Sequence, residues 1–314
     1  MTDRLDPSAQ AVLEAMQEAD LPPLEGMSAK DARQAFRERR GRRRPELPEI
    51  AGVEDRLMAL DGRDLAIRIY RPLGPGPHPV IVYFHGGGWV VGDLDTHDTL
   101  CRLLCAASGM GVVAVDYRLA PDAPFPTAAE DAVAATEWVA REAAELGFDP
   151  GWIGVAGDSA GGNLSAVAAL ALRGGSVTLR AQGLIYPAVD MTLEHPSHRA
   201  AKTDIVLTHA VMRWFRDHYV PRSESWRDWR ASPLHADDHV GLPPAFVLTA
   251  GFDSLSDEGL AYAVRLRDAG VSVVERPWPG QFHGFLSMIG LIPEAYVATE
   301  ELGHWFRDLA ARGR

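Results

Sequence analysis

The chain has 314 residues, enough for one large α/β domain or two ordinary ones. Its hydrophobic content of 46% and charged content of 24% are typical of a folded globular protein and argue against disorder. The formal net charge of −12 argues against a nucleic-acid partner, because phosphate binding needs clustered Lys and Arg. One basic run, RERRGRRRPE from Arg37 and counted together with Arg33, is interpreted as a solvated helix end followed by a turn.

The two cysteines, Cys101 and Cys105, are too few for a disulfide framework, and their spacing places both on one helix face. We expect buried apolar side chains there, with a redox pair or a metal site as the alternative. The first 20 residues lack the apolar core of a signal peptide, and no stretch reaches the roughly 18 apolar residues of a membrane span. A cytoplasmic protein without a membrane partner is therefore predicted.

Two amphipathic helices are predicted before residue 45, within SAQAVLEAMQEAD and SAKDARQAFRERR. The first places Val12, Leu13 and Met16 on one face, and the second presents Ala35 and Phe36. After the Pro-rich RPELPEI the period changes to two, and VEDRLMAL, DGRD and LAIRIYRP have the pattern of a strand, a turn and a strand.

From residue 79 onward, short apolar runs alternate with helix-length segments. The runs are PVIVYF, GVVAVDYR, WIGVAG, AQGLIYP, PAFVLTAG and VSVVERPWP, and helical segments such as TAAEDAVAATEWVAREAAELG separate most of them. Strands that are apolar on both faces and are separated by helices predict a mostly parallel central sheet flanked by helices, an α/β fold.

The interval between LIYP and PAFVLTAG is too long for a plain crossover, and long insertions on an α/β sheet are usually functional. Because it gathers several aromatic residues between 214 and 229, we interpret it as part of a helical cap that the N-terminal helices join, packed on these aromatics. The predicted division is 1–48 for the N-terminal part of the cap, 49–187 for the first part of the core, 188–240 for the cap insertion and 241–314 for the second part of the core.

The segment GDSAG, residues 157–161, lies between an apolar strand and an apolar helix and matches the G-x-S-x-G nucleophile elbow. Its turn is so tight that the residues two before and two after the serine, Gly157 and Gly161, must lack side chains. The hydroxyl of Ser159 would stand above the sheet at a helix N-terminus, where the dipole favours negative charge. Ser159 is therefore the predicted nucleophile.

A serine nucleophile needs a base and an orienting acid, and in this type of sheet the chain order is Ser, Asp or Glu, then His. Asp253 lies just past the end of a strand. Asp257 and Glu258 are its rivals, but Asp257 fits an S-x-x-D capping box that begins at Ser254. His283 lies in the loop after the last strand, so Asp253 and His283 are the predicted acid and base. The histidines of the insertion have no metal-like spacing.

The segment HGGGW follows the strand PVIVYF, and its glycines would bring bare N–H groups to the oxygen of a reacting carbonyl. The elbow supplies another N–H, from Ala160. Such a donor is typically worth roughly 2.7–4 kcal/mol in the transition state. A phosphate site is the rival interpretation, but the Lys-Ser/Thr of a P-loop does not follow.

Together, HGGGW, YRLAPDAPFPTAAED, GDSAGG, GFDSLSDEG and FHGF resemble the signature blocks of the bacterial hormone-sensitive-lipase-like esterases, an α/β-hydrolase family. The resemblance runs from near residue 53 to the C-terminus, with the blocks in the expected order. It implies the α/β-hydrolase fold with a helical cap and short to medium acyl substrates. The residues it implies are a triad of Ser159, Asp253 and His283, an oxyanion hole of Gly87, Gly88 and Ala160, and Gly86 shaping the turn.

The sequence therefore predicts a serine carboxylesterase that uses no metal or cofactor and acts on small-molecule acyl esters. An amide or formamide hydrolase with the same triad stays open. So does a non-catalytic binder like the plant gibberellin receptors of related fold, although such receptors lack the catalytic histidine. The oligomeric state is also open, with a homodimer as one alternative.

Overall fold

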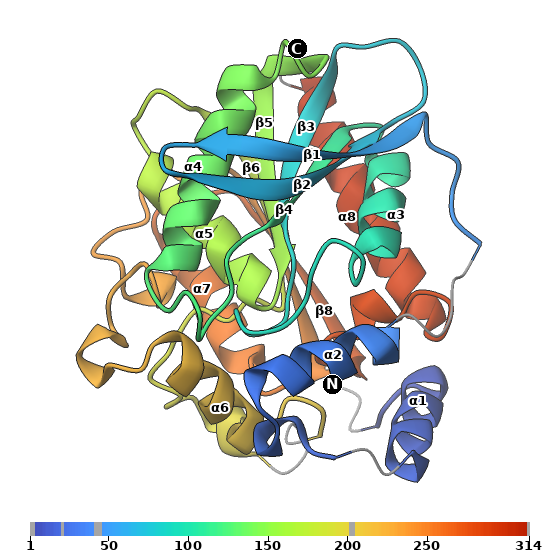
Figure 1. Cartoon of the computed structure of the whole chain (residues 1–314), viewed down its shortest axis with the longest axis vertical. Coiled ribbons are helices and arrows are strands. Elements are labelled where there is room, and N and C mark those ends of the chain that lie inside the picture. The colour runs from blue at the N-terminus through green and yellow to red at the C-terminus, as the bar shows by residue number, and fades with distance from the viewer. Residues whose placement is uncertain (1–3, 20–21, 41–45, 201–204, 313–314) are drawn as a thin grey trace.

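A computed structural model of the chain describes residues 4–19, 22–40, 46–200 and 205–312. Eight strands form one sheet in the order β1-β2-β4-β3-β5-β6-β7-β8 (Figure 1). The pairs β1–β2 and β2–β4 are antiparallel and all other neighbours are parallel, which confirms the predicted mostly parallel sheet. The strands are β1 (Gly52–Leu60), β2 (Arg63–Arg71), β3 (His78–Phe84), β4 (Gly111–Asp116), β5 (Phe148–Asp158), β6 (Leu179–Ile185), β7 (Ala245–Phe252) and β8 (Val273–Phe282).

Helices cover both faces of the sheet, α4, α5 and α7 one face and α3 and α8 the other (Figure 1). The α-helices are α1 (Pro7–Glu18), α2 (Ala29–Arg40), α3 (Asp98–Ser108), α4 (Thr127–Glu142), α5 (Ala160–Leu172), α6 (His209–Tyr219), α7 (Ser256–Asp268) and α8 (Pro293–Arg312). Short 3₁₀ turns are η1 (Leu24–Gly26), η2 (Pro196–Arg199), η3 (Ser223–Ser225), η4 (Pro233–His235) and η5 (Phe285–Met288).

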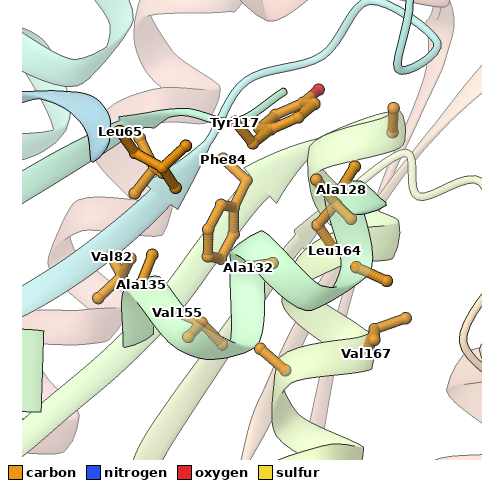
Figure 2. Packing of buried hydrophobic residues seen from close by; sticks show 14 of the residues in the cluster. Leu65, Val82, Phe84, Tyr117, Ala128, Ala132, Ala135, Val155, Leu164 and Val167 are labelled. Atoms are coloured by element: carbon orange, nitrogen blue, oxygen red, sulfur yellow. The ribbon is translucent and has the colours of Figure 1, made fainter. Parts of the chain in front are cut away.

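The alternation of side chains along β3 explains why its sequence is apolar on both faces. Val82 and Phe84 belong to the core under α4 and α5, whereas Ile81 and Tyr83 belong to the core under α3 and α8. Figure 2 shows Phe84 beside the alanines of α4 and near Leu164 of α5. Small side chains on α4 let this helix lie close to the sheet.

The parallel strands end at the same edge of the sheet, so the loops that follow β3, β5, β7 and β8 come together there. This edge carries HGGGW, Ser159, Asp253 and His283, and the helices α2 and α6 lie at the same end of the molecule (Figure 1). Residues more than a hundred positions apart are thereby brought into one site.

The second N-terminal helix, α2, is fastened to the loop that follows HGGGW. The guanidinium of Arg33 donates to the carbonyl oxygens of Val90 (2.9 Å) and Ala120 (2.8 Å), and Arg37 pairs with Asp93. The predicted solvated helix end is confirmed for Arg37, Glu38 and Arg39, which are exposed where α2 ends, whereas Arg33 is partly buried against the core. Residues 41–45 of that basic run lie outside the described residues.

The two N-terminal helices pack against different parts of the molecule. Leu13 of α1 is buried in a cluster with Phe282 and Phe285, at the end of β8, whereas Met16 is 40% exposed. The segment η1 contacts α6, and Phe36 of α2 joins the cluster that holds the aromatic residues of the insertion. The expected packing on the insertion is thus wrong for α1, whereas η1, which lies between the two helices, does contact α6 of the insertion. The division into cap and core stays a prediction.

Two further expectations concern the cysteines of α3 and the presence of membrane-spanning helices. Cys101 and Cys105 are buried free cysteines, as the apolar interpretation of their spacing predicted. Within the described ranges, no helix is both long and apolar enough to cross a bilayer.

Candidate active site

Ser159 stands at the turn between β5 and α5, with φ 57° and ψ −116°. These angles lie outside the regions that ordinary side chains prefer, so the turn must be held by its surroundings. A Cβ on Gly157 would overlap the backbone of Gly161, and one on Gly161 would overlap the carbonyl oxygen of Phe84. The two glycines are therefore required by close backbone contact, as the tightness of the turn predicted.

The structure brings Ser159, His283 and Asp253 into one hydrogen-bonded chain. His283 Nε2 lies 2.9 Å from Ser159 Oγ, and His283 Nδ1 lies 2.8 Å from Asp253 Oδ2. Asp253 is 1% exposed, and its second oxygen accepts the backbone N–H of Leu255 at 2.8 Å. With its Nδ1 proton directed at the carboxylate, the imidazole presents a free lone pair on Nε2 to the serine hydroxyl, the arrangement that activates a serine.

Asp257 does not reach the histidine, but the reason differs from the one expected. Helix α7 begins at Ser256 without a side-chain cap, so the predicted capping box is not formed. Ser254 Oγ instead donates to the carbonyl oxygen of Leu207, and Asp257 Oδ2 accepts the N–H of Ser197 at 2.8 Å. The Asp257 carboxylate is therefore hydrogen-bonded to the insertion rather than to the first turn of α7.

Glu258, Asp190 and three histidines of the insertion form a separate group away from the triad, partly buried in the protein. Glu258 accepts the N–H groups of Val189 and Asp190, and its other oxygen lies 2.5 Å from His198 Nε2. Burial raises the pKa of Glu258, against the effect of His198. Asp190 in turn contacts His195 (3.2 Å) and His235 (3.0 Å). The contacts of Glu258 fasten the insertion to α7, whereas those of Asp190 lie within the insertion. The described part of the chain contains no cluster of three residues suited to a metal ion.

The glycine-rich loop after β3 presents backbone N–H groups beside Ser159. Gly86 N–H is already committed, because it donates to Asp158 Oδ1 at 3.0 Å. Gly87 (φ 124°) and Gly88 (φ 57°) have left-handed backbones, which glycine adopts without strain. Within the described residues, the N–H groups of Gly87, Gly88 and Ala160 have no acceptor. Three unpaired donors at this edge suit an oxygen that gains negative charge.

Sequence reasoning missed the buried side chains behind this loop. Asp158 Oδ1 accepts from Tyr83 Oη (2.7 Å) as well as from Gly86, and His85 Nδ1 lies 2.8 Å from the Gly86 carbonyl oxygen. The His85 ring stacks on Tyr117 at 4.3 Å, and burial lowers the pKa of His85 to about 4, so this imidazole is neutral. A signal was available, since a carboxylate that ends an apolar strand must find buried donors.

Helix α6 places an aromatic ring directly over the glycine-rich loop. A Cβ on Gly88 would overlap the ring of Phe215, so the ring lies against this glycine. Phe215 also joins a small apolar cluster beside the site, made of Leu193, Leu207, Val211, Met212 and Leu255, with Ala188 packed against it. The N–H of Ala188 donates to the carbonyl oxygen of Ser159 at 3.2 Å. The surroundings of the serine are therefore apolar on the side of the insertion.

The chain is similar to known proteins over most of its length. A family model described as the alpha/beta hydrolase fold matches residues 81–287. The carboxylic ester hydrolase LipN of Mycobacterium tuberculosis is 44% identical over 246 residues, which cover 76% of this chain and 65% of LipN, just under two thirds of its length. The ethyl acetate hydrolase of Pseudomonas putida is 38% identical over 279 residues, 87% of this chain and 88% of that protein.

A solved structure extends the similarity to the whole chain. The ester hydrolase EH1AB1 from the metagenome of Lake Arreo, complexed with a derivative of bipyridine phosphonate, superposes with a TM-score of 0.93. The two proteins are 38% identical, and the match covers 99% of this chain and 100% of the other. The N-terminal segment and the insertion, for which no sequence block was recognised, therefore have counterparts in that protein.

Proposed function

Because the chain belongs to the hormone-sensitive-lipase-like branch of the α/β-hydrolase family, we propose that it is a serine carboxylesterase for short- to medium-chain acyl esters. The observation that carries the proposal is the hydrogen-bonded chain from Asp253 through His283 to Ser159. The ester-hydrolysing relatives support the same reaction, and the ethyl acetate hydrolase supports a small acyl group.

In the first half of the proposed reaction, Ser159 Oγ attacks the ester carbonyl carbon while His283 Nε2 takes the hydroxyl proton. The carbonyl oxygen becomes an alkoxide, which the N–H groups of Gly87, Gly88 and Ala160 stabilise. The C–O bond to the alcohol then breaks, and His283 returns its proton to the departing oxygen. The products of this half are the free alcohol and an acyl group bound to the serine.

In the second half, His283 takes a proton from a water molecule that attacks the acyl carbon. Collapse of this intermediate releases the carboxylic acid and returns the proton to Ser159. Asp253 holds the imidazole in the productive tautomer and stabilises its charged form during both halves. In both halves, Nε2 of His283 must begin without a proton, because this nitrogen is the base.

A panel of aryl esters of increasing acyl length, with matched anilides, tests this proposal. We expect rapid cleavage of short and medium esters, slow or no cleavage of the anilides, and no change when a chelator is present. Preferential cleavage of anilides would favour the amide hydrolase, which the ester-hydrolysing relatives do not support. Tight binding of the esters without turnover would favour the non-catalytic binder.

The cytoplasmic location and the homodimer are kept as proposals. The free cysteines of α3 are compatible with a reducing compartment, where disulfides are rare. Cell fractionation tests the location, and sedimentation velocity at several concentrations tests self-association. A single species with the mass of one chain at every concentration would exclude the homodimer.

A further inference from the structure

Asp6, the residue before α1, binds the end of strand β8 instead of capping its own helix. An aspartate at this position usually accepts an N–H from the first helical turn, but α1 has no side-chain cap. The carboxylate of Asp6 instead accepts from Gln281 Nε2 at 2.9 Å, and the Asp6 N–H donates to the Gly280 carbonyl oxygen at 2.9 Å. Two hydrogen bonds thus join residue 6 to two consecutive residues near the other end of the chain.

Gly280 makes room for this carboxylate. A Cβ on Gly280 would overlap the carboxyl group of Asp6, although the backbone of Gly280 lies outside the left-handed region and would accept an alanine. Gln281 is fully buried, so its side-chain amide depends on partners within the protein. Both partners near the end of β8 therefore favour the contact: Gly280 leaves space for the carboxylate, and Gln281 donates a hydrogen bond to it.

The contact lies where β8 passes into the loop of the proposed base. Strand β8 is at the edge of the sheet, with β7 as its neighbour, and it ends at Phe282, directly before His283. Behind the contact, Leu13 of α1 packs in the cluster of Phe282, and Ser8 Oγ donates to Glu294 of α8 at 2.8 Å. The N-terminal segment is thus joined to the three residues that precede His283.

We propose that Asp6 is a positioning residue for His283, an inference that rests on the proposed esterase function. By holding Gly280 and Gln281, Asp6 fixes the end of β8, and this fixes the imidazole between Asp253 and Ser159. The docking of the N-terminal segment is then part of the active arrangement, even though Asp6 touches no reacting atom.

Four variants at two positions test the inference, with 4-nitrophenyl acetate as the substrate. Asp6→Ala removes the acceptor, and we expect kcat to fall by roughly tenfold, within the loss of up to about 10²-fold that a 1 Å misplacement causes. KM should stay within about twofold, because His283 serves both halves of the reaction and both slow together. Asp6→Asn keeps an oxygen acceptor for Gln281 and should keep kcat near that of the wild type.

Gly280→Ala forces a methyl group against the carboxylate and should lower kcat much as Asp6→Ala does. In the double variant Asp6→Ala/Gly280→Ala, the methyl group has nothing to displace, so kcat should equal that of Asp6→Ala. Gly52→Ala is the matched control: nothing lies within 4 Å of its added Cβ, its φ is ordinary, and it should leave kcat unchanged.

Hydrogen exchange of the backbone at residues 279–284 provides a measure that does not depend on catalysis. Faster exchange in Asp6→Ala and Gly280→Ala, but not in Gly52→Ala, would support the inference. Wild-type kcat in a folded Asp6→Ala variant, or fully additive losses in the double variant, would overturn it. If the wild-type protein hydrolysed no ester, the esterase proposal would be refuted instead. In that case, unchanged hydrogen exchange in Asp6→Ala would also show that Asp6 does not hold the end of β8.

Discussion

At the scale of single residues, the hydroxyl of Ser159 carries the whole proposed reaction. Replacing Ser159 by Ala should lower kcat for aryl esters on the order of 10⁶-fold, because the remaining residues cannot form an acyl-enzyme. The fold should persist, since the change removes one oxygen atom. Steady-state kinetics together with a thermal unfolding scan check this. Substantial turnover by a folded variant free of wild-type protein would contradict the mechanism.

The choice between neighbouring carboxylates can be decided by a matched pair of variants. Asp253→Asn should lower kcat roughly 10⁴-fold at neutral pH, as in serine proteases, because an amide favours the wrong histidine tautomer. Asp257→Asn should keep most activity, because that side chain binds the N–H of Ser197. Rates for both variants at pH 7.5 settle the question. If Asp253→Asn left kcat unchanged and Asp257→Asn lowered it strongly, Asp257 would be the acid that orients His283.

At the scale of secondary structure elements, α6 controls the space above the glycine-rich loop through Phe215. Phe215→Ala removes the ring that contacts Gly88, and we expect the preferred acyl chain to lengthen while acetyl esters are still cleaved. Because this ring is only partly buried, the free energy of unfolding should fall by less than the roughly 3–5 kcal/mol of a fully buried Phe→Ala change.

Values of kcat/KM for aryl esters from acetyl to decanoyl measure this preference. The ratio of the decanoyl to the acetyl value should rise in Phe215→Ala. An unchanged ratio in a folded variant would mean that α6 does not limit the acyl chain.

The sequence predicted those elements whose signals are local. Short apolar runs identified every strand of the parallel core, and the pair Gly157 and Gly161 identified the elbow, because both signals depend on neighbours in the chain. The contact of Asp6 with Gln281 spans 275 positions, and no sequence pattern near either residue predicts it. The capping box failed for the same reason, since Ser254 and Asp257 found partners in the insertion rather than in their own turn.

At the scale of the whole molecule, the insertion contains an ion pair between His195 and Asp190 whose stabilising contribution depends on pH. The hydrogen bond to Asp190 raises the pKa of His195, with Glu258 and Asp257 also nearby. A raised pKa means that His195 contributes stability below its unfolded pKa, near about 6.5, and loses that contribution as the pH rises through its folded value. The insertion itself should therefore be more stable at pH 5.5 than at pH 8.5.

His195→Gln tests this linkage. The variant should lower the free energy of unfolding by about 1 kcal/mol more at pH 5.5 than at pH 8.5, the net contribution of a typical intramolecular hydrogen bond. Urea unfolding at the two pH values gives the difference. His304→Gln, a change at an exposed histidine of α8, serves as the control. An equal or larger loss at pH 8.5 would show that the charge of His195 is not involved.

Helix α8 begins beside α1 and ends at Arg312, at the opposite end of the molecule from α1, α2 and α6 (Figure 1). The two ends of the chain are therefore unequal as points of attachment for an immobilised catalyst. A solid support or a fusion partner coupled beyond Arg312 faces away from Ser159 and leaves substrate access open. Coupling through the N-terminal end would place the support or fusion partner a few residues from Asp6, on the segment that holds the loop of His283.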